Sequence, residues 1–287
     1  MKKLAKAILI TAGLATGLHA VNDAIFKLAA RRDCTPKSHT YKWRFGNIHY
    51  TVSGADNKPP LLLVHGIGVG AGSHEWDRAI ASLSQSYHVY AIDLLGFGRS
   101  DKPALSVSAY LYVQQINDFV RNVIKEETFL AANNLSASFA AVAAALKPKF
   151  FKKMIFIAPH ALKPPVPTAK QKWLKRLLEA PIIGTSIYLA FCSKWFKRLA
   201  DCRIVPPNKL AERNISECFY RAAHRGGANA RFPMAAFLTG FLYIDTKRAL
   251  AQLSTPSQTI WADASSLYPH IDNPKALTRT CEKFFTR

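Results

Sequence analysis

Short apolar runs alternate with longer stretches of helical periodicity over most of the chain. Four of these runs have the length and the continuous apolar character of strands that are buried on both faces. The four runs cover residues 61–64, 88–94, 128–133 and 153–158. Helical patterns separate them, at 76–83, 110–124 and 139–146. This order is typical of a mostly parallel sheet flanked by helices, so the pattern predicts the α/β class.

The two ends of the predicted sheet carry their own signals. Short strand patterns at 42–45 and 48–52 flank Gly46-Asn47, which predicts an antiparallel hairpin ahead of the parallel strands. A last strand pattern comes at 258–262, and a helical pattern follows it at 274–285.

Residues 163–240 interrupt the alternation, because they are helix-like and punctuated by prolines. An insertion between two strands of one sheet explains this with the fewest assumptions. We therefore predict an N-terminal helix with a linker over 1–40 and an α/β core made of 41–162 and 241–287. A helical lid over 163–240 would cap that core.

The first 30 residues carry an apolar stripe with helical spacing. Its members recur every three or four positions: Ile10, Leu14, Leu18, Val21, Ile25 and Leu28. Lysines precede the stripe, and Arg31 and Arg32 follow it, which suits an anionic membrane surface. We expect a membrane-associated protein; the alternative is a cytoplasmic one whose helix packs on the protein itself. The sequence Leu18-His19-Ala20 lacks the small outer residue of a signal-peptide cleavage site.

Basic residues outnumber acidic ones along the whole chain. The 287 residues include 39 Lys and Arg against 18 Asp and Glu, a formal net charge of +21. Between 147 and 231 there are 18 Lys and Arg and only 4 Asp and Glu, so +14 of the net charge of +21 lies in this stretch, which includes most of the predicted lid. Such a surface suits anionic lipid, nucleic acid or an acidic substrate. Nucleic acid ranks last, because Trp173, Trp195 and Phe196 have the pattern of packing residues and not of an exposed stacking platform.

The remaining composition excludes several classes of protein. With 49% hydrophobic residues the chain can bury a sizeable core, which excludes an intrinsically disordered protein. The five cysteines include no CxxC pair, so neither a zinc site nor a disulfide framework is indicated. We predict no cofactor and no metal, and the sequence leaves the oligomeric state open.

Three loops follow predicted strands, at the edge where ligands bind in open α/β sheets. The first holds His65-Gly66-Ile67-Gly68, whose glycines let backbone N–H groups approach an oxyanion. The second runs from Asp93 to Ser100 and contains two glycines. Its aspartate is expected to bond backbone N–H groups, which is a structural role.

The third loop, Asn134-Leu135-Ser136-Ala137-Ser138, lies between the predicted strand 128–133 and a helix of small residues. A nucleophile on such a strained turn needs small neighbours two residues away. Ser136 has Asn134 and Ser138 at those places, and in a shifted register Ser138 has Ser136 and Ala140. A serine that caps the following helix is the structural alternative.

Three motifs follow one another along the chain: His-Gly-x-Gly, Asp-x-x-Gly-x-Gly-x-Ser and the serine turn. Their order resembles that of the α/β-hydrolase superfamily. The whole chain looks like a group of bacterial membrane-associated α/β-hydrolase-like proteins. The resemblance implies Ser136 as the nucleophile and the N–H groups of Ile67 and Ala137 as the oxyanion hole. Four further residues are expected to bind substrate: His65, Gly66, Gly68 and Trp173.

The C-terminal end departs from the pattern of the superfamily, which places an acid after the penultimate strand and a histidine before the last helix. Asp263 is the nearest acid, and only 24 residues follow it, too few for a crossover, a strand and a helix. Leu267 takes the place of the histidine, and His270 is its neighbour. We therefore predict that the last strand is missing, with His270 as the base and Asp263 as the acid that orients it.

Two functions follow from these observations. The first is a serine hydrolase that acts on an ester or a related small acyl substrate at a membrane. The second is a catalytically degenerate α/β-hydrolase-like protein that binds a ligand or a membrane. The first is the leading hypothesis, and the second is motivated by the missing strand, Leu267 at the place of the histidine and the absence of glycines around Ser136.

Overall fold

The computed structural model describes residues 2–29, 39–159, 166–193, 213–261 and 269–286. Its centre is a seven-stranded sheet with the strand order β1-β2-β4-β3-β5-β6-β7. The strands are β1 (His39–Trp43), β2 (Gly46–Ser53), β3 (Pro60–Val64), β4 (His88–Ile92), β5 (Thr128–Asn133), β6 (Phe151–Ile157) and β7 (Ser257–Ile260). The pairs β1–β2 and β2–β4 are antiparallel, and the other four pairs are parallel. The predicted α/β class and the hairpin are both confirmed.

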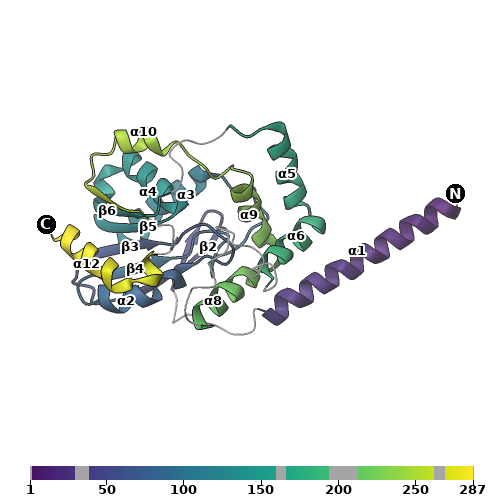
Figure 1. The fold of residues 1–287 in the computed structure, drawn as a ribbon, viewed down its shortest axis with the longest axis horizontal. Helices are drawn as coiled ribbons and strands as arrows, with labels where there is room; N and C mark the ends of the chain where they lie inside the picture. Colours follow the sequence, from purple (N-terminus) through teal and green to yellow (C-terminus); the bar gives the residue numbers. More distant parts are fainter. Residues whose placement is uncertain (1, 30–38, 160–165, 194–212, 262–268, 287) are drawn as a thin grey trace.

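Helices cover both faces of the sheet (Figure 1). One face holds α2 (Asp77–Leu83) and α12 (Pro274–Phe285), and the other holds α3 (Ala109–Phe119), α4 (Leu135–Leu146) and α10 (Thr246–Ala251). Successive strand residues point to opposite faces, so Leu61 and Leu63 pack on the α2 side and Leu62 and Val64 on the α3 side. Short helical segments complete the core: η1 (Ser73–Trp76), η2 (Val120–Ile124), η3 (Pro148–Phe150) and α11 (Pro269–Asp272).

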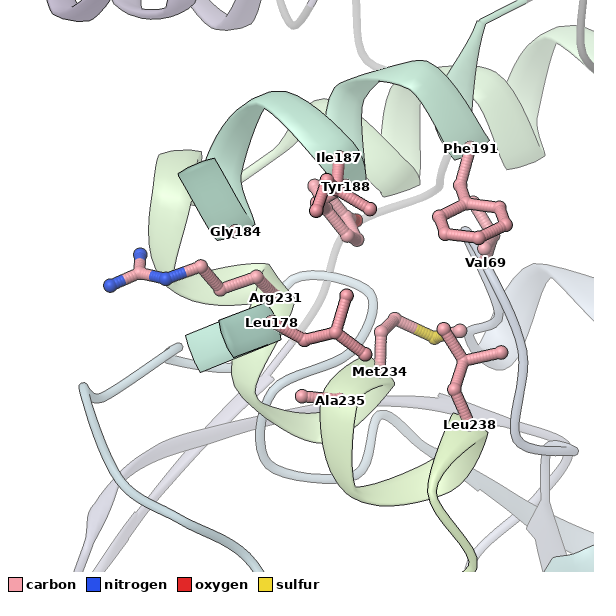
Figure 2. A pocket seen from close by; sticks show the side chains of 10 residues that line it. All are labelled: Val69, Leu178, Gly184, Ile187, Tyr188, Phe191, Arg231, Met234, Ala235 and Leu238. Carbon is pink, nitrogen blue, oxygen red and sulfur yellow. The ribbon is translucent and has the colours of Figure 1, made fainter. Parts of the chain in front are cut away.

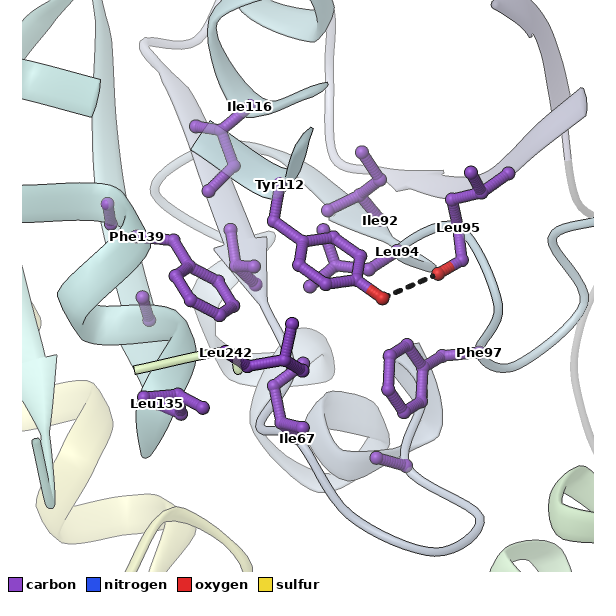
Figure 3. Close-up of a cluster of buried hydrophobic side chains, with 14 of the residues drawn as sticks. Ile67, Ile92, Leu94, Leu95, Phe97, Tyr112, Ile116, Leu135, Phe139 and Leu242 are labelled. Atoms are coloured by element: carbon purple, nitrogen blue, oxygen red, sulfur yellow. Dashed lines mark hydrogen bonds between the residues drawn. The ribbon is translucent and has the colours of Figure 1, made fainter. Parts of the chain in front are cut away.

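The core on the α3 side also fixes the loops that follow β3 and β4 (Figure 3). The Tyr112 hydroxyl donates to the carbonyl oxygen of Leu95 at 3.2 Å, and the Tyr112 ring stacks on Phe139 with centroids 5.3 Å apart. Burial raises the pKa of this hydroxyl well above its usual range, which keeps the donor protonated. Ile67 and Phe97, one from each loop, are buried in the same cluster. The buried cluster on the α3 side therefore holds both loops in place.

Between β6 and α10 the chain leaves the sheet and forms a helical insertion. Its described helices are α5 (Ala169–Glu179), α6 (Ile183–Cys192), α8 (Arg213–His224), η4 (Gly227–Ala230) and α9 (Arg231–Leu238). They contact one another and stand together beside the sheet (Figure 1). The predicted helical insertion is therefore present, whereas its limits at 163 and 240 stay a prediction. Within the described residues, β7 is the last strand and forms the edge of the sheet beside β6.

The N-terminal helix α1 (Lys2–Ala29) projects away from the rest of the molecule (Figure 1). Near its C-terminal end it packs on the insertion through Asn22 and Phe26. The Asn22 side-chain amide donates to Ser186 Oγ at 3.1 Å, and the Phe26 ring packs against the rings of Tyr188 and His224. None of the helices in the described ranges is long and apolar enough to cross a membrane.

The predicted apolar stripe of this helix is not the face that packs. Its described members are between 38% and 70% exposed: Leu14, Leu18, Val21, Ile25 and Leu28. At 3.6 residues per turn the stripe lies about a quarter of a turn away from Asn22 and Phe26. The helix therefore packs on the protein through Asn22 and Phe26, while the stripe itself is exposed, and the membrane association of this helix stays a prediction.

Candidate active site

The sharp turn after β5 is made by Asn134. This residue has φ 53° and ψ −131°, and α4 begins directly after it at Leu135. A nucleophile in the Gly-x-Ser-x-Gly motif sits on such a strained strand-to-helix turn, with small residues two positions before and after it. Ala132 and Ser136 are the small residues at those places. The residue at the nucleophile position is therefore Asn134.

Ser136, which we expected on the turn, lies instead in the first turn of α4. Its side chain is fully buried, and so is that of Ser138, the alternative nucleophile. The reason is that the helix begins four residues earlier than the apolar pattern predicts, so both serines are helical. Ser136 corresponds to the second glycine of the motif and not to its serine.

The predicted oxyanion hole changes with the turn residue. The Ala137 N–H donates to the carbonyl oxygen of Asn134 at 3.1 Å, as part of the first turn of the helix. It is therefore not the oxyanion donor we expected. The N–H of the residue after the nucleophile takes that role in the superfamily, which here is Leu135. Ile67 lies in the loop after β3, as predicted, and its role stays a prediction.

His65 is a structural residue and not the substrate ligand we expected. It is completely buried, its Nδ1 lies 2.6 Å from the carbonyl oxygen of Gly66, and its Nε2 accepts the N–H of Leu94 at 3.0 Å. Because Nε2 accepts, the proton of the neutral ring is on Nδ1, and both nitrogens are used by backbone groups. His65 thereby ties the loop after β3 to the loop after β4.

Gly66 brings the loop after β3 close to the turn. A Cβ atom at this position would lie 2.9 Å from Asn133 Nδ2 and 3.3 Å from Asn134 Cβ, so only glycine permits this approach. The Gly66 N–H donates to Glu75 Oε2 at 3.0 Å, and it is therefore not available to a substrate. Gly68 belongs to the same loop, and its carbonyl accepts the N–H of Ala71 at 3.2 Å.

Glu75 is a buried carboxylate that the sequence patterns missed. Its Oε2 accepts from the side chain of Asn133 at 3.2 Å and lies 3.6 Å from His270 Nε2. Burial alone would raise the pKa of this carboxyl, but the His270 side chain, the neighbouring His65 and the Gly66 N–H together lower it below its usual value. Glu75 thus remains ionised beside the turn.

His270 is almost completely buried, with its ring centroid 4.6 Å from that of Trp76. Among the described residues, its carboxylate neighbour is Glu75. Asp263 and Leu267 lie outside the described residues. The structure brings a glutamate and a histidine together beside the turn, but the turn itself presents a carboxamide.

The loop after β4 has the structural role that we predicted. Asp93 accepts the N–H groups of Ser73 at 2.6 Å and of Arg99 at 2.9 Å. A Cβ atom at Gly98 would collide with the carboxylate of Asp93. Among the described residues, no group of three or more His, Cys, Asp or Glu is placed to hold a metal ion.

Comparison with known proteins agrees with this geometry. A family model described as the alpha/beta hydrolase fold matches residues 59–180, which include all three loops and the turn. Over this segment the chain is similar to the α/β-hydrolase family, and its sheet with the flanking helices has the fold of that superfamily. Solved structures match over nearly the whole chain. A hydrolase from Pseudomonas aeruginosa PA01 has a TM-score of 0.68 at 15% identity, covering 88% of this chain and 100% of its own.

Other relatives are spread over several activities. A bacterial membrane phospholipase A has a TM-score of 0.61 at 20% identity and covers 100% of this chain and 98% of its own. Human 1-acylglycerol-3-phosphate O-acyltransferase ABHD5 is 29% identical over 151 residues, 50% of this chain and 43% of the relative. A haloalkane dehalogenase from Bradyrhizobium diazoefficiens is 29% identical over 111 residues, 39% of this chain and 35% of the relative. The chain thus matches less than half the length of these two curated relatives.

A small cavity lies where the insertion packs on the loop after β3. The cavity between that loop and α5, α6 and α9 has a volume of about 10 Å³, room for about one water molecule. Figure 2 shows Val69 facing Leu178, Tyr188, Met234 and Leu238 across it. Trp173, which we expected in the substrate site, does not line this cavity and is 64% exposed on α5.

Proposed function

We propose that the protein is a non-catalytic α/β-hydrolase that binds at a membrane surface through α1. The observation that carries the first half is the residue on the turn after β5. Asn134 stands at the nucleophile position, with its backbone in the strained conformation. A carboxamide has no acidic proton for a base to remove and does not form the acyl-enzyme intermediate of a serine hydrolase.

The surroundings of the turn support the same proposal. Ser136, the serine next to the turn, is fully buried within α4. Glu75 and His270 remain beside the turn, but their chemistry needs a hydroxyl between them and the substrate. An ester or acyl substrate is therefore not part of this proposal.

A fluorophosphonate probe tests the missing nucleophile directly. We expect no labelling of the native chain and no turnover of a short p-nitrophenyl ester, with the same result for Ser136→Ala. The matched variant Asn134→Ser puts a hydroxyl on the turn and is expected to gain labelling. Labelling of the native chain that disappears in Ser136→Ala would overturn the proposal and restore the serine hydrolase.

The exposed stripe of α1 supports the membrane half of the proposal. Five large apolar side chains on one side of a helix are costly to leave in water, and they are a common feature of helices that lie in a membrane interface. Thr16, His19, Asp23 and Lys27 lie on the other side. The basic residues near the two ends of the helix and the net charge of +21 favour an anionic lipid surface.

Sedimentation with anionic vesicles measures this interaction. We expect Leu18→Ser combined with Ile25→Ser to weaken vesicle binding about tenfold or more, because about 1 kcal/mol or more of apolar burial is lost for each side chain. The control combines His19→Ser with Ala24→Ser, two exposed positions outside the stripe, and should bind like the native chain. Equal binding of both double variants would contradict a role for the stripe.

A further inference from the structure

An open cleft lies between the β1–β2 turn, the loop after β4 and the junction of α8 with η4. Its volume is about 430 Å³, within the range of sites for small ligands. The lining residues on which the argument depends are Phe45, Arg99, Asp101, Lys102, Arg225 and Gly226. We call this the basic cleft. None of the residues around Asn134 lines it, so it is separate from the candidate active site.

The lining of the basic cleft carries more positive than negative charge. Arg99, Lys102 and Arg225 are its cations, and Asp101 is its one carboxylate. Asp101 Oδ2 accepts the N–H of Asn47 at 2.7 Å, which holds this carboxylate at the hairpin turn. The cleft is therefore a cationic site with a net charge of about +2 at neutral pH.

Lys102 is unusual because its charge is nearly buried, with the residue only 9% exposed. Its ammonium donates to the carbonyl oxygens of Gly98 at 2.8 Å and of Ser100 at 3.2 Å, which uses two of its three donors. Its aliphatic part packs against Gly226, where a Cβ atom would lie 2.5 Å from Lys102 Cδ. A buried ammonium whose hydrogen bonds go to neutral carbonyls is costly.

The charges around this ammonium only partly compensate the cost. Burial and the neighbouring Arg225 lower the pKa of Lys102 to about 8, although Asp93 and Asp101 act in the opposite direction. An anion in the cleft would relieve this penalty, and it would also meet the guanidinium groups of the two arginines.

We propose that the basic cleft binds the phosphate group of a ligand through Arg99, Lys102 and Arg225. Guanidinium groups bind oxyanions with two parallel hydrogen bonds, and three cations match a phosphate monoester with its three terminal oxygens better than a monocarboxylate. The cleft is larger than a phosphate, so the rest of the ligand lies beside Phe45, which is 42% exposed at the rim. This proposal does not depend on whether the turn at Asn134 is inactive.

Two sources of such a phosphate share the same chemistry, a lipid headgroup and a soluble phosphate ester. The position of the cleft is compatible with a lipid headgroup, because α1 contacts both α8 and η4, the two elements that Arg225 and Gly226 connect. The cleft is thus next to the part of α1 that packs on the insertion.

Calorimetric titration of the full chain with inorganic phosphate and with glycerol 3-phosphate, at constant ionic strength, tests the site. We expect saturable binding that Arg225→Gln weakens about tenfold, the loss of one charge-assisted contact. Arg225→Lys should lose less, because it keeps the charge. Arg176→Gln on the exposed side of α5 removes the same charge outside the cleft and should bind like the native chain. A cooperative thermal transition checks that each variant is folded.

Vesicles separate the two sources. Phosphatidylcholine vesicles with and without phosphatidic acid measure the preference of the chain for a phosphomonoester headgroup. If Arg225→Gln removes this preference, the ligand is a lipid; if it weakens only glycerol 3-phosphate binding, the ligand is a soluble ester. Absence of saturable phosphate binding, or an equal loss in Arg176→Gln, would overturn the proposal. Failure of all vesicle binding contradicts the membrane role of α1 and leaves the phosphate site standing.

Discussion

The turn after β5 and the basic cleft are opposite kinds of site in one molecule. At the turn, Asn134 is half-buried and its backbone keeps the strained shape of a hydrolase turn, while Ser136 and Ser138 next to it are fully buried. The basic cleft, in contrast, is open, cationic and about 430 Å³ in volume. The difference teaches that packing by neighbouring elements can preserve the shape of such a turn even where, as we propose, the turn has no catalytic role.

A substitution that disturbs the packing of α8 on the loop after β3 should lower the free energy of unfolding more than any of the other substitutions we propose. Gly70 has φ +74°, and a Cβ atom there would collide with the backbone carbonyl of Phe219 in α8. We expect Gly70→Ala to lower the free energy of unfolding by about 3 kcal/mol or more, because backbone must move in both elements. Chemical denaturation measures this change.

Gly227→Ala is the matched control for Gly70→Ala. Gly227 has a similar φ of +69°, but nothing lies within 4 Å of the added Cβ. It should therefore cost only the backbone preference, about 1 kcal/mol. Equal losses in the two variants would show that the loop does not depend on its contact with α8.

The buried charge of the cleft predicts an effect of pH on stability. Because the pKa of Lys102 falls from 10.5 to about 8 on folding, the unfolded chain binds more protons between these two values. The contribution of Lys102 to the free energy of unfolding should therefore rise with pH across this window, by about 3 kcal/mol in total, and should be lost again as the pH falls through 8.

Denaturation of the native chain and of Lys102→Met across this range of pH tests that expectation. The native chain should gain relative to Lys102→Met as the pH rises. Lys172→Met, on the exposed side of α5, controls for the loss of a lysine. A difference between the native chain and Lys102→Met that does not change with pH would contradict a buried charge in the cleft.

The strain of the turn should give the smallest of these effects. Asn134→Gly removes the cost of a positive φ at a residue with a Cβ atom, and we expect the free energy of unfolding to rise by about 1 kcal/mol. Lys125→Gly, at a positive φ of 66° in an ordinary helix-end position, is the comparison. A loss of stability in Asn134→Gly would mean that the asparagine side chain itself holds the turn.

The fold could be predicted from the sequence because its signals are local. Each parallel strand is a short apolar run, and the hairpin has its turn residues at Gly46-Asn47. The predicted start of α4 was wrong by four residues, since Leu-Ser-Ala-Ser at 135–138 has no apolar periodicity to mark it as helical. The periodicity of α1 was found correctly, but its packing face was not. Asn22, a polar residue, makes that contact.

The site was predicted less well than the fold, for two physical reasons. Serine is small enough to take the place of a glycine, so Ser136 gave the motif a false register by two positions. The spacing of Ala132 and Ser136 around Asn134 was the signal that identifies the turn. Glu75 and His270 are far apart in the chain and come together only through packing, so no spacing in the sequence predicts their contact.

On α1, the exposed apolar stripe and the side that packs through Asn22 and Phe26 are separated by a fixed angle. This angle has a consequence for the evolution of the segment. Each residue added to or removed from a helix rotates everything beyond it by about 100°. Inserting one residue between Leu14 and Asn22 would rotate the part of the stripe before the insertion by about 100° relative to the part after it. The stripe would then no longer lie on one side of the helix. This exposed helix should therefore tolerate many substitutions but few changes in length, as a core element does.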